Sequence, residues 1–265
     1  AEASDVIVVA VGERFGQSGE KASKVNIAIP EGQQKLVSEL AKTGKPVIAL
    51  VMCGRPVIFN EIREHADAVL CTWWLGSEAG NAICNVLWGE YNPSAKLPMT
   101  FPAHVGQIPI YYQNKSTGRP TALKQTYKAS YIDASTEPAY PFGYGLSYTD
   151  FGYSDLKLLP GKAAGVHTEV SVKVTNTGKC AGEEVVQLYV QDKVASVTRP
   201  IKELKGFRKI HLNAGESKTV VFQITDDALG FYDNEMNYMV EPGDFVFMVG
   251  GSSDDVQQIT YNLEE

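Results

Sequence analysis

The chain has 265 residues, a formal net charge of −7 and 44% hydrophobic residues, which is ordinary composition for one large domain or two smaller ones. The negative charge, with no local basic run, argues against a nucleic-acid-binding or anionic-membrane-binding surface. The longest apolar runs, such as Val6–Val11 and Val47–Met52, are strand-sized and fall short of the roughly 20 residues that a membrane-spanning helix needs. The first residues show neither the basic nor the apolar segment of an export signal.

Up to about residue 120, apolar runs alternate with segments of helical periodicity. Strands are predicted at Asp5–Val11, Val47–Met52 and Ala68–Thr72. Helices are predicted at Pro30–Thr43, from Pro56 to about His65, and at Ser77–Trp88. This order, with continuous apolar strands buried on both faces, predicts a mostly parallel sheet that helices cover on both sides.

The predicted sheet is unusually small for one that helices cover on both faces. Such a sheet normally has five or more strands, and only three are evident before residue 100. Residues 1–4 lead directly into the first strand. We therefore expect either a small sheet or one whose front strands lie in a segment missing from this chain.

From about residue 151 the helical signal disappears and apolar residues alternate with polar ones. Examples of the alternation are Val170, Val172 and Val174; Val186, Leu188 and Val190; Val220, Phe222 and Ile224; and Phe245, Phe247 and Val249. Turn residues separate these runs, so the pattern predicts an antiparallel β-sandwich of about seven strands. The expected domains are thus an α/β domain at 1–120 and a sandwich at 151–265. Residues 121–150, rich in Tyr, Pro and Gly, are expected to form an ordered interdomain strap.

The cysteines and histidines show no metal-binding spacing, and we expect neither a metal nor a cofactor. Cys53 and Cys71 each end an apolar run, where a thiol usually behaves as a small buried hydrophobic group. Free thiols are the main expectation for this pair. A disulfide between them is the alternative, because pairing depends on geometry that the sequence does not contain.

Four segments, spread along most of the chain, resemble glycoside hydrolase family 3. Their sequences are most similar to those of its bacterial periplasmic β-glucosidases. They are Gly54–Val57 (GRPV), Gly76–Pro102 (GSEAGNAICNVLWGEYNPSAKLPMTFP), Tyr140–Tyr148 (YPFGYGLSY) and Thr198–Phe207 (TRPIKELKGF). The resemblance implies a barrel domain, then an α/β sandwich domain, then a fibronectin type III-like domain. This chain corresponds to the later part of the second domain, the strap and the third domain. The fold class expected is therefore α/β plus all-β, with the front strands of the α/β domain absent.

The resemblance also assigns the chemistry. Retaining glycosidases use one carboxylate as nucleophile and another carboxyl group as general acid/base. The barrel motif that carries the family's nucleophile has no counterpart here, so no nucleophile is expected in this chain. The acid/base residue of the family comes from a loop of the second domain, and Ser18–Lys24 matches that loop. Glu20 is accordingly the candidate acid/base, and Lys24 is a candidate substrate-binding residue.

The loop differs from the family pattern at two positions, and a second glutamate is also a candidate. Lys21 stands where the family has a small residue, and Lys24 stands where it has arginine, which offers a bidentate fork that lysine lacks. Without the resemblance, Glu20 would be a solvated carboxylate on a polar loop. Glu13 is the second candidate, because it follows the first strand at its carboxyl edge, where ligands of open α/β sheets bind. Its alternative is a structural hydrogen-bond partner.

The function that follows is part of a β-glucosidase-type hydrolase acting on terminal β-D-glucosyl residues of oligosaccharides or glucosides. The expected partner is the missing N-terminal barrel, the expected location is periplasmic or secreted, and the isolated chain is expected to be inactive. One alternative is a non-catalytic scaffold or carbohydrate-binding fragment. Another is a nucleotide- or phosphate-binding α/β protein fused to an adhesin-like sandwich, which the missing Gly-rich fingerprint after the first strand disfavours.

Overall fold

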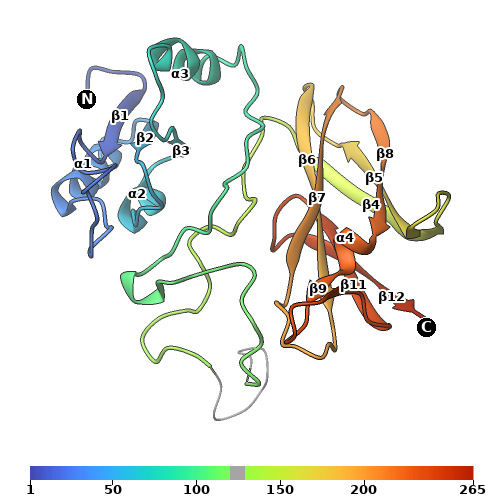
Figure 1. The fold of residues 1–265 in the computed structure, drawn as a ribbon. Helices are drawn as coiled ribbons and strands as arrows, with labels where there is room; N and C mark the ends of the chain where they lie inside the picture. The colour runs from blue at the N-terminus through green and yellow to red at the C-terminus, as the bar shows by residue number, and fades with distance from the viewer. Residues whose placement is uncertain (120–128, 265) are drawn as a thin grey trace. The chain divides into compact units, whose positions relative to one another are not determined.

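The computed structural model describes residues 1–119 and 129–264, which fall into two compact units (Figure 1). The first unit comprises Ala1–Tyr91, Thr100–Ile110 and Ser135–Tyr140, and the second comprises Asn92–Met99, Tyr111–Ala134 and Pro141–Glu265. The strap expected at 121–150 contributes to both units, and its residues 121–128 lie outside the described part of the chain. Within the described residues, no helix is long and apolar enough to cross a membrane.

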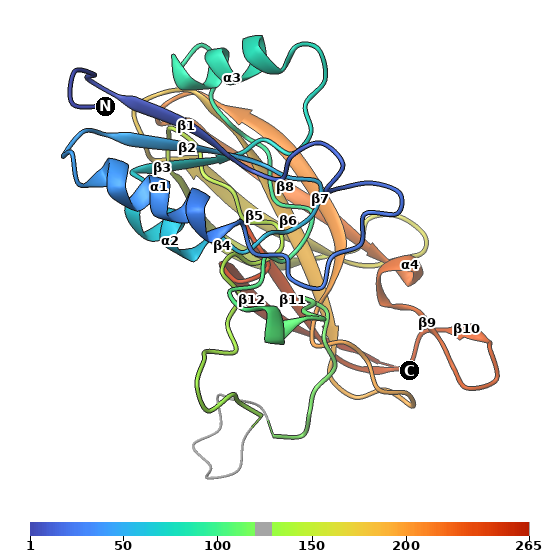
Figure 2. The same ribbon diagram turned by 90° about the vertical axis from the view of Figure 1, so that its left-hand side faces the viewer.

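The first unit is built on a three-stranded parallel sheet in the order β1-β2-β3. Its strands are β1 (Ile7–Gly12), β2 (Val47–Met52) and β3 (Ala68–Cys71). Its helices are α1 (Glu31–Ala41), α2 (Asn60–His65), α3 (Ala79–Leu87) and the 3₁₀ turn η1 (Val105–Gln107). α1 and α2 lie together on one side of the sheet, and α3 lies on the other side (Figures 1 and 2). The predicted parallel α/β arrangement is confirmed.

Two local predictions in this unit need correction. The second helix begins at Asn60 and not at Pro56, because Ile58 is extended and pairs with the chain before α1: its N–H donates to Ile27 O (3.1 Å) and its carbonyl accepts from Ile29 N (2.9 Å). β1 is not buried on both faces. Val9 and Val11 are buried, whereas Val8 is 45% exposed, because the described residues cover only one face of this strand.

The second unit is an antiparallel sandwich of two sheets, with strand orders β12-β11-β6-β7 and β4-β5-β8. The seven strands are β4 (Phe151–Pro160), β5 (Val166–Asn176), β6 (Gly182–Asp192), β7 (Glu203–Leu212), β8 (Ser217–Thr225), β11 (Gly243–Gly250) and β12 (Val256–Leu263). A short helix α4 (Asp226–Leu229) and the hairpin β9 (Phe231–Tyr232) and β10 (Tyr238–Met239) complete it. The seven-stranded sandwich predicted from the alternating pattern is confirmed.

The registers explain why that alternation builds one core. Val170 and Val172 of β5 pair with Phe222 and Val220 of β8, so the alternate residues of both strands face inward together. The inward valines of β5 and β6 form one buried cluster with the inward phenylalanines of β11. A one-residue slip would turn this apolar set toward water, so burial of the core fixes the register.

Part of the strap is held tightly within the second unit. Gly143 adopts φ +79°, and an added Cβ would lie 2.1 Å from the Gln187 side-chain oxygen, so only glycine fits there. The Gln187 amide donates to Gly143 O (3.1 Å) and to Gly251 O (2.6 Å). This buried side chain therefore ties the YPFGYGLSY motif to the end of β11.

Candidate functional site

The loop that follows β1, residues 13–28, contains every candidate residue predicted from the sequence. The chain leaves β1 through Gly12, where φ is +127° and an added Cβ would lie 2.0 Å from Met52 O. The Gln33 side chain, in the first turn of α1, accepts from Gly12 N (2.7 Å) and donates to Gly12 O (3.1 Å). Both ends of the loop are thereby fixed to the carboxyl edge of the sheet.

Glu13 lies at the bottom of this loop, and its side chain is almost fully buried. Its Oε1 is 3.1 Å from Arg55 Nε and 3.5 Å from Lys24 Nζ, and its Oε2 accepts from Gly54 N (3.2 Å). A buried carboxylate is stable only when cations and hydrogen-bond donors compensate its charge, and Glu13 has both. These contacts favour the structural role for Glu13 over a catalytic one.

Arg55 is the residue that sequence reasoning missed. It belongs to the GRPV motif, which was noticed only as part of the family resemblance. Besides its contact with Glu13, its Nη2 donates to Gln17 O (2.7 Å) and to Ala22 O (2.8 Å). Every residue has a backbone carbonyl, so the residue types in the loop could not have predicted these contacts.

Glu20 lies between the two carbonyls that Arg55 holds. Gly19 (φ +108°) and Lys21 (φ +59°) flank it in left-handed conformations, and Ala22 N donates to Gly19 O (3.2 Å). The tight turn leaves Glu20 exposed, and within the part of the chain that the structure describes, its carboxylate has no hydrogen-bond donor or ion-pair partner. The structure therefore brings Glu13 and Lys24 together and leaves the Glu20 carboxylate free for an external group.

The three tryptophans of the first unit differ in their surroundings. Trp73 packs edge-on against Phe101, with ring centroids 5.8 Å apart, which is a packing role. Trp74 and Trp88 are 48% and 74% exposed. No group of three or more potential metal-ligating His, Cys, Asp or Glu residues occurs among the described residues.

Cys53 and Cys71 are free thiols whose sulfur atoms lie 3.9 Å apart at the ends of β2 and β3. Their hydrogen bond, together with burial, raises the pKa of the Cys53 thiol. The same hydrogen bond lowers the pKa of Cys71.

We expect an alkylating reagent to modify Cys71 well before Cys53 as pH rises, because the thiolate is the reactive form and Cys53 is fully buried. Peptide mapping by mass spectrometry after timed iodoacetamide treatment measures both rates. Urea-unfolded protein, in which the two residues should react alike, is the control. Equal rates in the folded protein would contradict the expectation.

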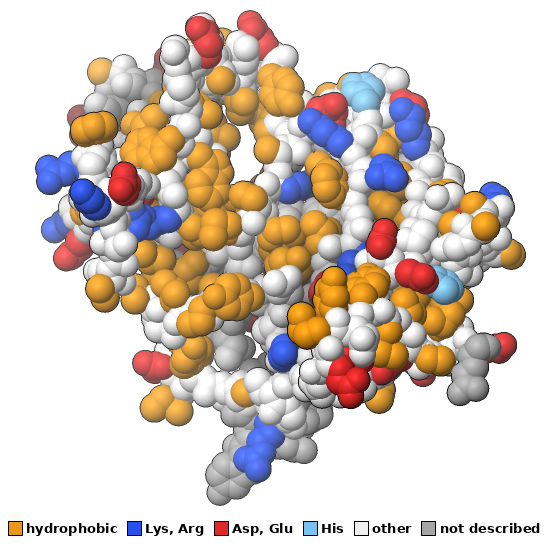
Figure 3. Space-filling model, in the orientation of Figure 1, with side chains coloured by type: hydrophobic (Ala, Val, Ile, Leu, Met, Phe, Trp, Pro, Cys, Tyr) orange, Lys and Arg blue, Asp and Glu red, His pale blue; other side chains and the backbone are white. Residues whose placement is uncertain are grey.

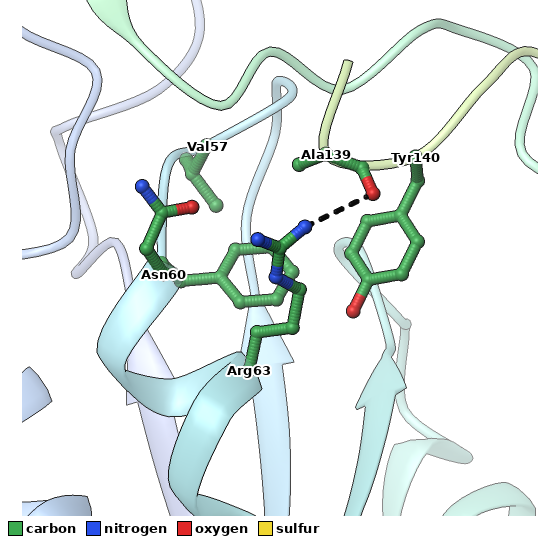
Figure 4. Close-up of a pocket in the computed structure, with 6 residues that line it drawn as sticks. Val57, Asn60, Arg63, Ala139 and Tyr140 are labelled. Atoms are coloured by element: carbon green, nitrogen blue, oxygen red, sulfur yellow. Dashed lines mark hydrogen bonds between the residues drawn. The ribbon is translucent and has the colours of Figure 1, made fainter. Parts of the chain in front are cut away.

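A shallow pocket in the first unit lies where α2 meets residues 139–140 (Figure 4). The Arg63 guanidinium donates to Ala139 O (3.2 Å) and lies over the Tyr140 ring, 5.9 Å from its centroid. Tyr140 in turn stacks on Phe59, with ring centroids 6.0 Å apart. Arg63 and the aromatic rings of this pocket thus contact one another. The pocket is therefore a packing feature of the unit.

The second unit holds a larger cavity, of about 240 Å³, bordered by a buried ion pair. Lys96 Nζ lies 3.1 Å from Glu184 Oε2 and donates to Gly145 O (3.0 Å). Tyr153 donates its hydroxyl proton to Glu184 Oε1 (2.8 Å), and burial, reinforced by the Glu184 charge, raises the pKa of Tyr153. Lys96 and Glu184 compensate each other's charge within the unit, and the exposed Asp150 and Asp255 also border the cavity.

Comparison with known proteins identifies a domain family for each part of the chain. Residues 1–148 match the glycosyl hydrolase family 3 C-terminal domain, and residues 184–253 match a fibronectin type III-like domain. A periplasmic β-glucosidase of Salmonella typhimurium is 47% identical over 99% of this chain and 35% of that protein. A β-xylosidase of Formosa agariphila is 42% identical over 100% of this chain and 36% of that protein.

Solved structures agree with the sequence relatives. A β-glucosidase from Listeria innocua, crystallised in complex with glucose, superposes with a TM-score of 0.94 at 41% identity, covering 100% of this chain and 37% of that one. The chain thus spans little more than a third of the length of the proteins it matches. A family match over more than half of the chain, with relatives this similar over nearly all of it, shows that the chain belongs to glycoside hydrolase family 3, as its C-terminal α/β and fibronectin type III-like parts.

Proposed function

We propose that this chain is the C-terminal part of a retaining β-glucosidase-type glycoside hydrolase that acts on terminal β-D-glucosyl residues of oligosaccharides or glucosides. The observation that carries the proposal is the loop after β1, which presents the Glu20 carboxylate exposed and unpaired while Lys24 and Arg55 are bound to Glu13. The glucose complex of the Listeria innocua relative and the name of the Salmonella typhimurium relative support the substrate class. The latter name also supports a periplasmic location.

In this proposal Glu20 supplies the general acid/base, and the nucleophile is a carboxylate on an N-terminal barrel domain outside this chain. Glu20 protonates the leaving glycosidic oxygen while the nucleophile attacks the anomeric carbon. The ionised Glu20 then removes a proton from the water that hydrolyses the glycosyl–enzyme intermediate. An acid working near neutral pH needs burial or a nearby carboxylate to keep its proton, and a facing barrel would supply both.

Glu13 offsets part of the positive charge near Glu20. Lys24 and Arg55 would draw the proton off a neighbouring carboxyl group if their charges were free. Both instead lie against Glu13, whose carboxylate offsets one of the two positive charges. We also propose Lys24 as a substrate contact, because its side chain remains 23% exposed on the same loop.

The uncovered apolar surface of the first unit supports the proposal that further family 3 segments precede β1. Val6 and Val8 are 48% and 45% exposed, and α3 has no buried residue despite its apolar sequence. Hydrophobic side chains are accordingly visible on the surface of this unit (Figure 3). Front strands of the α/β domain would cover such residues.

The direct test compares this chain with the intact enzyme. We expect the 265-residue chain alone to release no nitrophenol from an aryl β-D-glucoside, because it supplies the acid/base and lacks the nucleophile. The intact enzyme should release nitrophenol and glucose, with the β configuration of the product visible by proton NMR. Turnover by the isolated chain that Glu20→Gln abolishes would disprove the need for the barrel. An intact enzyme without action on β-glucosides would disprove the proposed substrate.

A further inference from the structure

Arg55 contacts the loop after β1 at three separate places. Its Nε lies 3.1 Å from Glu13 Oε1, and its Nη2 donates to Gln17 O and to Ala22 O at 2.7 and 2.8 Å. Gln17 and Ala22 stand on either side of Glu20, three residues before it and two residues after it. One planar guanidinium therefore holds both arms of the turn that carries the carboxylate.

Glu13 makes this arrangement stable. A largely buried guanidinium is costly unless a counter-charge compensates it, and Glu13 is that counter-charge. The Glu13 carboxylate is itself fixed, since its Oε2 accepts from Gly54 N at 3.2 Å. The ion pair is thus anchored to the backbone immediately after β2 and is not carried by the loop alone.

The loop also packs directly on Gly54. A Cβ at this position would lie 1.9 Å from Ser18 Oγ and 2.4 Å from Trp74 Nε1. Any side chain there would displace the loop two residues before Glu20. The GRP sequence therefore combines a residue without a side chain, on which the loop rests, with one whose long side chain fastens the loop.

We infer that Arg55 and Glu13 are positioning residues of the hydrolytic reaction, which hold the turn 17–22 in the conformation that presents Glu20 to the glycosidic oxygen. This inference rests on the proposed function, in which Glu20 is the acid/base. Lysine cannot replace Arg55 fully, because a single ammonium lacks the planar fork that reaches a carboxylate and two carbonyls at fixed angles.

The test uses the intact enzyme and two β-D-glucosides, one with a dinitrophenolate leaving group and one with a phenolate leaving group. Dinitrophenolate departs without protonation, whereas phenolate needs the acid. We expect Arg55→Met to raise the ratio of kcat/KM for the dinitrophenyl over the phenyl substrate about tenfold or more, since small misplacements of a catalytic group can cost up to about 100-fold. Arg55→Lys should raise the ratio less, and Glu13→Gln should raise it in the same direction.

This ratio separates positioning from folding. Partial unfolding lowers both rates equally and leaves the ratio unchanged, so Arg55→Lys decides the matter if Arg55→Met yields no folded enzyme. Arg63→Met is the matched control, because Arg63 bonds to Ala139 and not to the loop. The double variant Glu20→Gln/Arg55→Met should show no larger ratio than Glu20→Gln alone, because a misplaced acid and an absent acid are not additive.

The outcomes distinguish this inference from the proposed function. If Glu20→Gln raises the ratio while Arg55→Met and Arg55→Lys leave it at the wild-type value, the positioning role is wrong and Glu20 remains the acid. If Glu20→Gln leaves the ratio unchanged, both assignments fall. A ratio that rises as much in Arg63→Met as in Arg55→Met would also overturn the inference.

Discussion

Replacing Glu20 by alanine in the intact enzyme is expected to lower kcat/KM for phenyl β-D-glucoside by about 10²- to 10⁴-fold, the usual contribution of a general acid. For dinitrophenyl β-D-glucoside the first step needs no acid, so kcat/KM should fall far less. The glycosyl–enzyme intermediate should then accumulate, because no base activates water. Steady-state and burst kinetics on the two substrates measure both effects.

Azide gives this prediction a positive readout. A small anion can enter the space left by the carboxylate and attack the intermediate without a base, so azide should raise kcat for the dinitrophenyl substrate and form β-glucosyl azide with retained configuration. Glu64→Ala, at an exposed glutamate of α2, is the matched control and should resemble the wild type. A Glu20→Ala enzyme with the wild-type rate on the phenyl substrate would show that another group is the acid.

The second large effect is expected at the buried ion pair of the sandwich. Glu184→Ala removes the only carboxylate that the structure places against Lys96 within the described residues, and it also removes the acceptor of the Tyr153 hydroxyl. Loss of one partner of a buried pair leaves an uncompensated charge, so the free energy of unfolding should fall by about 3 kcal/mol or more. Hydrogen exchange of the amides of β5 and β6 in increasing urea measures this loss in the second unit.

Two variants make the stability test specific. Lys96→Met/Glu184→Leu removes both charges and should cost less than Glu184→Ala, because apolar side chains of similar volume replace a buried pair at little cost. Lys209→Ala breaks a more exposed pair with Glu183 in the same unit, and it should change the stability by less than about 1 kcal/mol. The three tryptophans all belong to the first unit, so their fluorescence should be insensitive to Glu184→Ala. A loss at Glu184 no larger than that at Lys209 would contradict the prediction.

The spacing of apolar residues was sufficient to predict the secondary structure that builds both units. The alternation of Val170, Val172 and Val174 predicted an inward face, and the register with β8 confirms it. The apolar run Val47–Met52 predicted a buried strand and matches β2 residue for residue. Both predictions succeed because a buried face requires apolar residues at a fixed spacing, and this spacing is visible in the sequence.

Burial of β1 could not be judged in the same way. Its run of residues is as continuously apolar as that of β2, yet Val8 is exposed while Val9 and Val11 are buried. The difference between the two strands lies in what packs on each face, and a strand's own sequence does not contain that information. The start of α2 failed for a related reason, because the pairing of Ile58 with Ile27 and Ile29 competes with helix formation.

The sequence by itself determined the two folds and the family and predicted Glu20 as the acid/base, because each of these depends on residue types at fixed positions. Only the tertiary structure decided what holds that carboxylate in place. Arg55 reaches Glu13, Gln17 and Ala22 across 33 residues or more of sequence, and two of its three partners are backbone carbonyls. Carbonyls carry no signature in the sequence, so the link between the GRP motif and Glu20 exists only once the chain has brought β1 and β2 side by side.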